Sequence, residues 1–362
     1  SAVDTRNNYY TCGYSAAINF PYVAGSYQSA PSGSNSAAVY YGTLSKFRPD
    51  RKLLFSTYFR SQSQANNGCG STPDTKLFDV AVDSLFNVYC VGSTNSNNMP
   101  IVPVTASGGL NQTSNGATGP SDCGNAIIFK LNPTGSGLRY SSYYGGNGGE
   151  YLEVAKYHNG QVWFGGRSRS SNLALVNSGG GVYSAGDGFF MRVDTQGVVK
   201  HCTKTGTEVK GGAVDNNGNW YIFGFTGATY GVNVLSPAPS FYTANAQSSI
   251  DWTLQRFAPG DFLNWSTYIG GNSNDYASNM TIRDTVMVLC GYGTSSVFPF
   301  VKASTDSGDV NTVASDEIQL MKFNTKTGQR LWSAYHATPN SEQAFDVAID
   351  PNYNLFVTGY VQ

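Results

Sequence analysis

Two motifs alternate along the chain, and their alternation limits the possible fold more than any other feature. The first, called here the V-D anchor, reads V-D-x-x-x-N-x-aromatic-x-x-G. Its four clear copies are Val3–Gly13, Val82–Gly92, Val214–Gly224 and Ile349–Gly359, and degenerate copies lie near Val154–Gly165 and Ile282–Gly291. The chain is therefore a repeat protein.

The second motif, called here the K-L anchor, has a basic residue, a turn rich in Asn, Pro and Gly, and a run of alternating apolar and polar side chains. It occurs at Lys46–Phe59, Lys130–Gly146, Arg192–Gly206, Arg256–Gly271 and Lys322–His336. Pro and Gly favour a tight turn between two such runs, so each copy predicts a hairpin. The copy that begins at Arg192 is the most divergent.

Each V-D anchor also predicts two short strands around a turn, because Asp and Asn side chains accept hydrogen bonds from the turn backbone. One V-D anchor and one K-L anchor together supply four antiparallel strands. Four antiparallel strands repeated at steps of 59 to 79 residues are typical of a blade of a β-propeller. The predicted fold is an all-β propeller of four-stranded antiparallel blades.

The two anchors are not equal in number, since the V-D anchor occurs six times and the K-L anchor five times. We therefore expect one propeller domain over residues 1–362, with six blades of which the sixth lacks its last two strands. The predicted blades are about 1–60, 74–146, 150–206, 208–271 and 275–337, with a half-blade at 342–362. Closure with five blades stays open. An incomplete blade exposes a strand edge, which invites completion by another segment or chain.

Composition agrees with an all-β chain and excludes several functions. The chain has 42 Gly, 24 Tyr and 20 Phe, and only 12% of its residues are charged. A net charge of −1 does not fit a nucleic-acid binder. No apolar run is long enough to span a bilayer as a helix. Ser1–Asp4 is typical of a strand, so we expect no signal peptide here; an exported protein would have lost it by cleavage.

The order of these motifs resembles the bacterial β-propeller repeats of the SBBP class. In that class a pattern close to A-V-D-x-x-G-N-x-Y-V-T-G precedes F-P and then K-L-N-P-x-G-x-x-L-x-Y-S-T-Y-x-G-G. The resemblance spans nearly the whole chain and is clearest near 81–146 and 256–300. It implies a secreted or surface-exposed bacterial protein, often part of a longer chain. It implies no catalytic residues.

Three groups of candidate site residues follow from the pattern. The Asp and Asn of the V-D anchors are interpreted as structural turn residues rather than as a calcium or acid–base site, and they are Asp4, Asn8, Asp83, Asn87, Asp215, Asn219, Asp350 and Asn354. Aromatic residues outside the repeat are candidates for contact with a ligand or partner, and they are Tyr22, Tyr27, Tyr230, Phe241, Tyr242 and Phe300. Aromatics that repeat within the K-L anchors are expected in the core. If one disulfide forms, Cys69 and Cys123 are the expected pair.

Signals for catalysis or a cofactor are weak. The three histidines form no H-x-x-x-H motif and no grouping with cysteine, and the chain has no nucleophile elbow, Walker loop or dinucleotide fingerprint. Glu150, Asp275 and Glu342 recur at strand starts, but a glycosidase needs two carboxylates that converge. Asp306–Asp309 suits a solvated turn better than calcium. We therefore expect no metal and no cofactor.

The long segments that join the second and third strands of each blade should emerge on one face, which we call the long-loop face. Three of them carry an apolar–Pro pair: Phe20–Pro21, Met99–Pro100 and Phe298–Pro299. The preferred function is a non-catalytic structural or adhesive module of a bacterial surface assembly. Its expected partners are other protein chains, further domains of the same polypeptide, or glycans. The alternative is a carbohydrate-binding or carbohydrate-active protein that uses the long-loop face.

Overall fold

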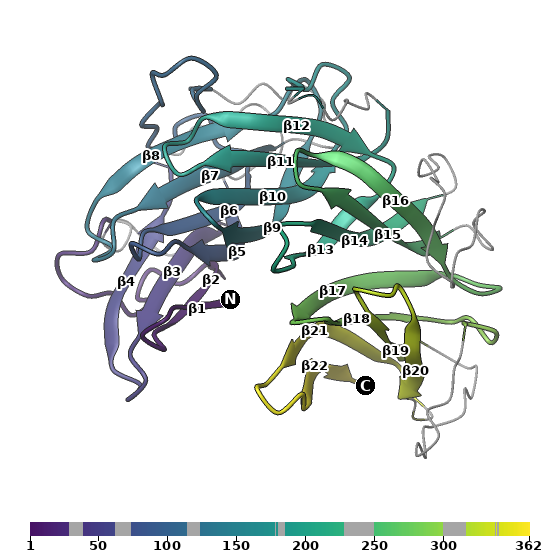
Figure 1. Ribbon diagram of the computed structural model, residues 1–362. Helices are drawn as coiled ribbons and strands as arrows, with labels where there is room; N and C mark the ends of the chain where they lie inside the picture. Colours follow the sequence, from purple (N-terminus) through teal and green to yellow (C-terminus); the bar gives the residue numbers. More distant parts are fainter. Residues whose placement is uncertain are drawn as a thin grey trace. The chain divides into compact units, whose positions relative to one another are not determined.

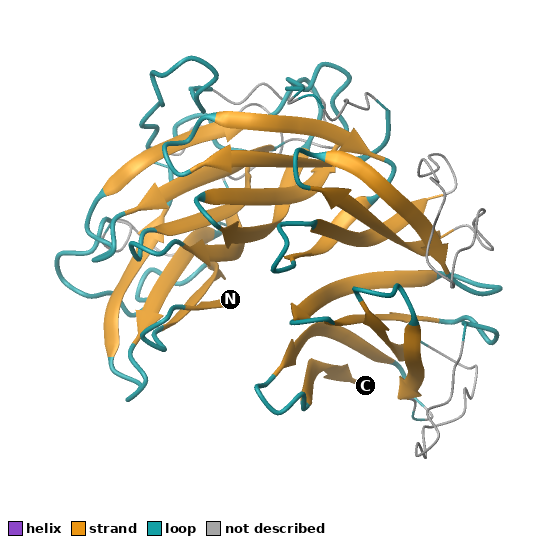
Figure 2. Ribbon diagram, viewed as in Figure 1, coloured by secondary structure: helices purple, strands orange, loops and turns teal. Residues whose placement is uncertain are grey.

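The computed structural model describes residues 1–28, 39–61, 74–113, 124–177, 179, 185–227, 250–299, 316–336, 338 and 340–362. Over these residues the chain forms strands and connecting loops, and no helix occurs among them (Figure 2). The chain divides into two compact units, which are described separately. Unit 1 comprises residues 1–177 and 190–203, and unit 2 comprises residues 178–189 and 204–362.

Three four-stranded sheets begin in unit 1, and in each the strands lie in the order of the sequence (Figure 1). The first contains β1 (Ala2–Val3), β2 (Tyr9–Ser15), β3 (Tyr41–Phe47) and β4 (Leu53–Phe59). The second contains β5 (Thr75–Val82), β6 (Val88–Thr94), β7 (Asn125–Leu131) and β8 (Leu138–Tyr144). The third contains β9 (Glu150–His158), β10 (Gln161–Ser168), β11 (Gly188–Asp194) and β12 (Val199–Thr205).

Unit 2 contains two further four-stranded sheets and one sheet of two strands. The four-stranded sheets are β13 (Glu208–Val214), β14 (Trp220–Gly227), β15 (Ile250–Ala258) and β16 (Phe262–Ile269), then β17 (Asp275–Arg283), β18 (Val286–Gly293), β19 (Glu317–Asn324) and β20 (Arg330–His336). The two-stranded sheet is β21 (Glu342–Ile349) and β22 (Leu355–Val361). The all-β prediction and the repeated four-stranded antiparallel sheet are therefore confirmed.

The core of each unit lies between neighbouring sheets and is rich in aromatic rings. In unit 1, Phe59 of the first sheet stacks on Phe129 of the second, with ring centroids 3.8 Å apart. In unit 2, Trp252 packs edge-on against Phe223 and Phe298, with centroids 5.1 and 4.9 Å away. Such pairs add to the stability that burial of apolar area provides. The sheets are therefore fixed to one another by side chains on their flat faces.

The aromatic residues that repeat within the K-L anchors lie in this core, as their periodicity predicts. Phe55, Tyr140 and Trp265 occupy one repeated position and are almost fully buried. The equivalent Trp332 is half-buried. The second repeated position is also buried, and its members are Tyr58, Tyr143, Tyr268 and Tyr335.

Candidate functional site

The carboxylate of Asp83 organises the turn between β5 and β6. Its Oδ1 atom accepts hydrogen bonds from the backbone N–H groups of Leu85 and Asn87, at 3.0 and 2.8 Å. Its Oδ2 atom accepts from the Asn87 amide and from the Tyr89 hydroxyl, each at 2.9 Å. The Lys130 ammonium lies 3.6 Å from the same oxygen. These contacts stabilise the turn, and they satisfy the buried Asp83 carboxylate with groups of the protein itself.

Three other V-D anchors form the same turn. In each, the asparagine amide donates to the aspartate carboxylate at 2.7 to 2.8 Å. The pairs are Asp4 with Asn8, Asp215 with Asn219, and Asp350 with Asn354. Tyr10 and Tyr221 also donate to their aspartates, whereas Phe356 stands at that position beside Asp350 and has no hydroxyl group.

The closing glycine of the V-D anchor lies opposite a register shift in the first strand of its sheet. In β5 the register shifts between Leu77 and Asp79, directly opposite Gly92. A Cβ atom on Gly92 would lie 1.9 Å from the carbonyl oxygen of Lys76. The equivalent distance is 1.8 to 2.2 Å at the closing glycines of the four later sheets, which are Gly166, Gly224, Gly291 and Gly359. Glycine is required here because backbone occupies the space of a side chain.

Sequence spacing places the end of the degenerate third V-D anchor near Gly165, but in the structure its closing glycine is Gly166. The register shift in β10 falls between Gly165 and Gly166, and it is the Cβ position of Gly166 that meets backbone, 1.8 Å from the Tyr151 carbonyl oxygen. The closing glycine is therefore one residue later than the spacing indicates, because two adjacent glycines left the register undefined.

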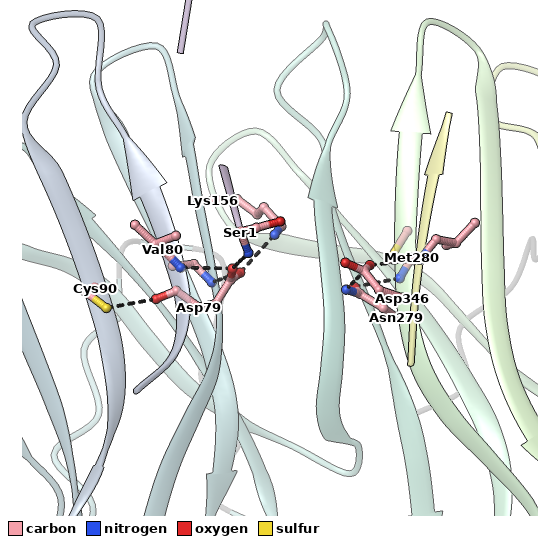
Figure 3. A network of polar contacts seen from close by, with 10 residues as sticks. Ser1, Asp79, Val80, Cys90, Lys156, Asn279, Met280 and Asp346 are labelled. Carbon is pink, nitrogen blue, oxygen red and sulfur yellow. Dashed lines mark hydrogen bonds and ion pairs between the residues drawn. The ribbon is translucent and has the colours of Figure 1, made fainter. Parts of the chain in front are cut away.

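Asp79, at the register shift in β5, is the centre of a polar network in unit 1 (Figure 3). The Oδ2 atom of Asp79 accepts from the Ala155 N–H and from the Lys156 ammonium, each at 2.9 Å. Its Oδ1 atom accepts from the Val80 N–H at 2.9 Å and from the amino group of Ser1 at 3.2 Å. Burial alone would raise the pKa of Asp79, but the Lys156 ammonium and the hydrogen bonds from Ala155 and Lys156 hold it below its usual value. Asp79 therefore joins β5 to β9 as an anion.

A related pair occurs in unit 2 (Figure 3). The Asn279 amide of β17 donates to Oδ1 of Asp346 on β21 at 2.7 Å. Both residues stand at the register shift of their strands, and each side-chain oxygen accepts from the N–H of the next residue, at 2.8 Å. Sequence reasoning missed this position, because the extra residue of the irregular strand falls inside a stretch of ordinary length.

The acidic residues that recur at strand starts are fully buried. Glu150 accepts hydrogen bonds from the hydroxyl groups of Ser168 and Ser170 and from the Gly146 N–H. Burial raises the pKa of Glu150, although these bonds act in the opposite direction. Glu342 likewise accepts from the Thr338 hydroxyl. Their carboxylates therefore tie a strand start to a neighbouring loop.

Asp275 is the third of these acids and has a second buried carboxylate near it. Its oxygens accept from the Gln319 amide at 2.7 Å, the Ser295 hydroxyl at 2.7 Å and the Gly271 N–H at 2.9 Å. Burial raises the pKa of Asp275 to about 6; these hydrogen bonds oppose the rise, and the charge of buried Asp251 adds to it.

This raised pKa predicts how stability depends on pH. The folded-state pKa exceeds the ordinary 3.8. The neutral carboxyl therefore contributes its full amount to the free energy of unfolding below pH 3.8, and this contribution is lost as pH rises through about 6. The loss is at most about 3 kcal/mol. Asp275→Asn keeps the neutral form, so the difference in unfolding free energy between variant and wild type should change by that amount between pH 4 and 7.5. Urea unfolding at both pH values measures it.

Asp50→Asn is the control, because Asp50 is exposed and its pKa is lowered to about 2 by hydrogen bonds, first from Arg48. It is ionised throughout this pH range. Equal pH slopes for wild type and Asp275→Asn would contradict the prediction.

The long loops that carry an apolar–Pro pair are fixed to the sheet where the pair begins. The Tyr143 hydroxyl accepts from the Met99 N–H at 3.0 Å and donates to the Ser96 carbonyl at 2.7 Å, and the Met99 side chain is buried. Phe20 N–H donates to the equivalent Tyr58 hydroxyl at 2.8 Å. A tyrosine of the fourth strand thus fixes the point where each of these loops leaves its sheet.

The candidate aromatic residues differ in their surroundings. Tyr22 is 50% exposed. Tyr27 is half-buried, stacks on Phe59 and donates its N–H to the Gly135 carbonyl at 2.8 Å, so it belongs to the packed edge of unit 1. The remaining candidates lie outside the described residues, and they are Tyr230, Phe241, Tyr242, Phe300, the expected pair Cys69 and Cys123, and Asp306–Asp309.

The four cysteines in the described part of the chain are free thiols. Cys90, Cys202 and Cys290 are buried and Cys12 is half-buried; burial raises the pKa of Cys202 and of Cys290 to about 12. Among the described residues, no three His, Cys, Asp or Glu side chains gather in a way that could hold a metal ion. Nor do these residues include a helix long and apolar enough to cross a membrane.

A pocket of about 460 Å³ lies within unit 2, at the turn ends of two neighbouring sheets. Its wall is polar and carries charges of both signs. The residues that line it are Asp215, Asn216, Asn217, Arg256, Asp284, Thr285, Thr325 and Lys326. Sequence reasoning missed this pocket because its residues come from four separate turns and strands.

These features define a repeat protein built from four-stranded antiparallel sheets. The family described as "SBBP: Beta-propeller repeat" matches residues 68–100, which include β5 and β6. The resemblance predicted from the sequence is confirmed there, and the chain contains a β-propeller repeat of this kind. No curated protein matches the chain.

Solved structures resemble the chain only distantly. A protein of unknown function from Bacteroides caccae aligns with a TM-score of 0.36 and 10% identity, over 81% of this chain and 90% of that chain. Phage phi92 endosialidase gives 0.39 and 11%, over 88% and 46%. CoXyl43, a GH43 β-xylosidase/α-arabinofuranosidase from a compost microbial metagenome, gives 0.35 and 9%, over 83% and 88%. At these scores the similarities carry no argument about activity.

Proposed function

We propose that the protein is a non-catalytic β-propeller module of an extracellular bacterial surface assembly, in which another segment or chain completes its two-stranded sheet. Such a module would have six blades, with β21 and β22 as the first half of the sixth. It would need no cofactor. The main support is the outer edge of β22, where a repeated motif that is buried elsewhere is exposed.

Strands β6 and β22 occupy the same place in the V-D anchor but differ in burial. All seven residues of β6 are buried, and β6 pairs with β5 on one side and β7 on the other. Among the strands that the structure describes, β22 pairs only with β21, and most of its residues are exposed. Tyr89 has no exposed surface, whereas Phe356, at the equivalent position, is 57% exposed. Exposed apolar groups along an unpaired edge favour addition of a strand.

The rest of the chain indicates which kind of strand fits this edge. In three whole sheets the third strand places a cation over the aromatic ring of the V-D anchor. Lys130 lies 4.8 Å from the Tyr89 ring, and Lys46 and Arg256 lie 4.9 and 5.9 Å from the equivalent rings. A hairpin with the K-L pattern would give Phe356 the same cation and would add the two missing strands. We therefore expect a partner hairpin of this type.

The acidic residues support a structural role over a catalytic one. Asp83, Glu150 and Asp275 are buried, and their carboxyl oxygens accept hydrogen bonds from the protein's own turns and strands. Groups engaged in this way stabilise the repeat. Low charge and many polar uncharged side chains suit contact with other extracellular proteins.

A synthetic hairpin with the sequence of residues 125–144 tests the proposal. We expect it to bind the purified protein and to slow hydrogen exchange of the amides of Leu355–Val361. Phe356→Glu should weaken binding by at least tenfold, because it buries a charge at the new interface. Leu85→Glu is the matched control: Leu85 is 73% exposed in the turn of a complete sheet, so its replacement should leave binding unchanged.

Two results would overturn the proposal. One is the absence of binding at millimolar hairpin. The other is exchange in β22 that is already as slow as in β6 before the hairpin is added, since the edge would then be covered. Native mass spectrometry of the protein from its source distinguishes completion by a second chain, which adds mass by association, from completion within a longer polypeptide.

A further inference from the structure

The pocket at the turn ends of β13–β16 and β17–β20 lies beside a cation that recurs at the equivalent position of two sheets in unit 1. In unit 1 the Lys130 ammonium donates to the carbonyl of Thr195, in the β11–β12 turn of the next sheet, at 2.8 Å. Lys46 likewise contacts the Pro133 carbonyl of the β7–β8 turn at 3.5 Å. In both cases a carbonyl oxygen in the turn of the next sheet accepts a hydrogen bond from the cation.

In unit 2, Arg256 occupies the position equivalent to that of Lys130, but it forms a different hydrogen bond. One of its terminal nitrogens donates to Asn264 of its own sheet at 2.7 Å. Its Nε atom is buried and has no hydrogen-bond partner among the described residues. The guanidinium is therefore only partly satisfied, and it lies in the wall of the pocket.

The turn of the next sheet explains why Arg256 is not covered. In the β7–β8 turn the Gly135 N–H donates to Asn132, three residues earlier. In the β19–β20 turn the Gly328 N–H donates to Asn324, four residues earlier, and the Thr325 N–H donates to Thr285 at 2.8 Å. This turn is thus held by its own sheet, and it contributes Lys326 to the pocket wall.

We propose that this pocket binds an acidic saccharide, a sugar unit that carries a carboxylate. Arg256 and Lys326 supply two cations for the carboxylate. Asn216, Asn217 and Thr285 supply neutral donors and acceptors for hydroxyl groups. Asp284, whose Oδ2 accepts from the Tyr353 hydroxyl at 2.7 Å, leaves Oδ1 for a sugar hydroxyl. A volume of about 460 Å³ lies in the range of small-ligand sites.

This mixture of groups sets the acidic saccharide apart from simpler anions. A purely anionic ligand would meet the carboxylates of Asp215 and Asp284 as well as the two cations. A neutral sugar would leave both cations without an anion. A ligand with hydroxyl groups on one side and a carboxylate on the other satisfies the two kinds of group together.

Backbone amide NMR with D-glucuronate as the probe tests this site. We expect saturable shifts at Asn216, Asn217 and Thr285, with D-glucose at least tenfold weaker. Lys326→Glu should weaken glucuronate at least tenfold, since one charge-assisted hydrogen bond is lost and a repulsive charge is gained. Lys326 is exposed, so this variant should fold normally. Lys52→Glu, at an exposed position in the β3–β4 turn, should have no effect.

Three outcomes would overturn the proposal. They are the absence of shifts at millimolar glucuronate, binding that Lys326→Glu leaves unchanged, and binding of a tetra-aspartate peptide as tight as that of glucuronate. The last would mean that charge alone is recognised. None of these results depends on strand addition at β22, so this site and the proposed function can fail separately.

Discussion

Gly92→Ala is expected to destabilise the protein by about 3 kcal/mol or more. The new Cβ atom would lie 1.9 Å from the Lys76 carbonyl oxygen and 2.9 Å from the Leu77 Cα atom, and backbone cannot rotate away as a side chain can. The strand irregularity of β5 would have to change, with the contacts of Asp79 beside it. Thermal and urea unfolding measure the loss.

Gly13→Ala is the matched control, because Gly13 closes the first V-D anchor where β1 has only two residues. The nearest atom to its Cβ position is the Thr43 Oγ1 atom, 3.9 Å away. Alanine should therefore be tolerated and should add about 0.5 kcal/mol by lowering the entropy of the unfolded chain. Similar losses for both variants would show that the strand irregularity does not determine the requirement for glycine.

Asp83→Ala should cost about 4 kcal/mol, the usual loss when one member of a buried charge pair is removed. It leaves the Tyr89 hydroxyl, the Asn87 amide and two backbone N–H groups without their acceptor. It also removes the anion beside Lys130, whose side chain is only 9% exposed. Urea unfolding measures the loss.

Asp350→Ala removes the same carboxylate from an exposed turn, where Phe356 replaces the tyrosine and water can solvate the released groups. We expect only a small fraction of the Asp83→Ala effect. Equal losses would mean that the turn itself, and not burial of its partners, determines the cost.

The sequence predicts the sheets well because each strand pair carries a local signal. The Asp and Asn of a V-D anchor, and the turn of a K-L anchor, act on residues close to them in sequence. Tyr143 and Tyr335 were assigned to the core from their period alone, and both are buried. Local chemistry repeated in a fixed order was sufficient here.

Contacts between sheets were harder to predict. The ion pair between Asp79 and Lys156 depends on how β5 and β9 are aligned, and no local sequence pattern predicts that alignment. The pocket beside Arg256 depends on how a turn about 70 residues later is hydrogen-bonded. The spacing placed the closing glycine of the third repeat at Gly165 and not at Gly166, because a single-residue shift of register is invisible beside a second glycine. Sequence predicts the unit of the repeat better than the differences between its copies.

A tyrosine hydroxyl lies at the base of the long loops that carry an apolar–Pro pair, and it marks where the sheet begins to constrain the chain. Upstream of the Met99 backbone the chain is constrained by the sheet, because Tyr143 fixes both Ser96 and Met99. Beyond Met99 the loop remains bonded to β8, because Val102 pairs with Ser141 and Gln112 pairs with Tyr143. The framework that a related sequence would have to keep therefore extends past the tyrosine and into the loop itself.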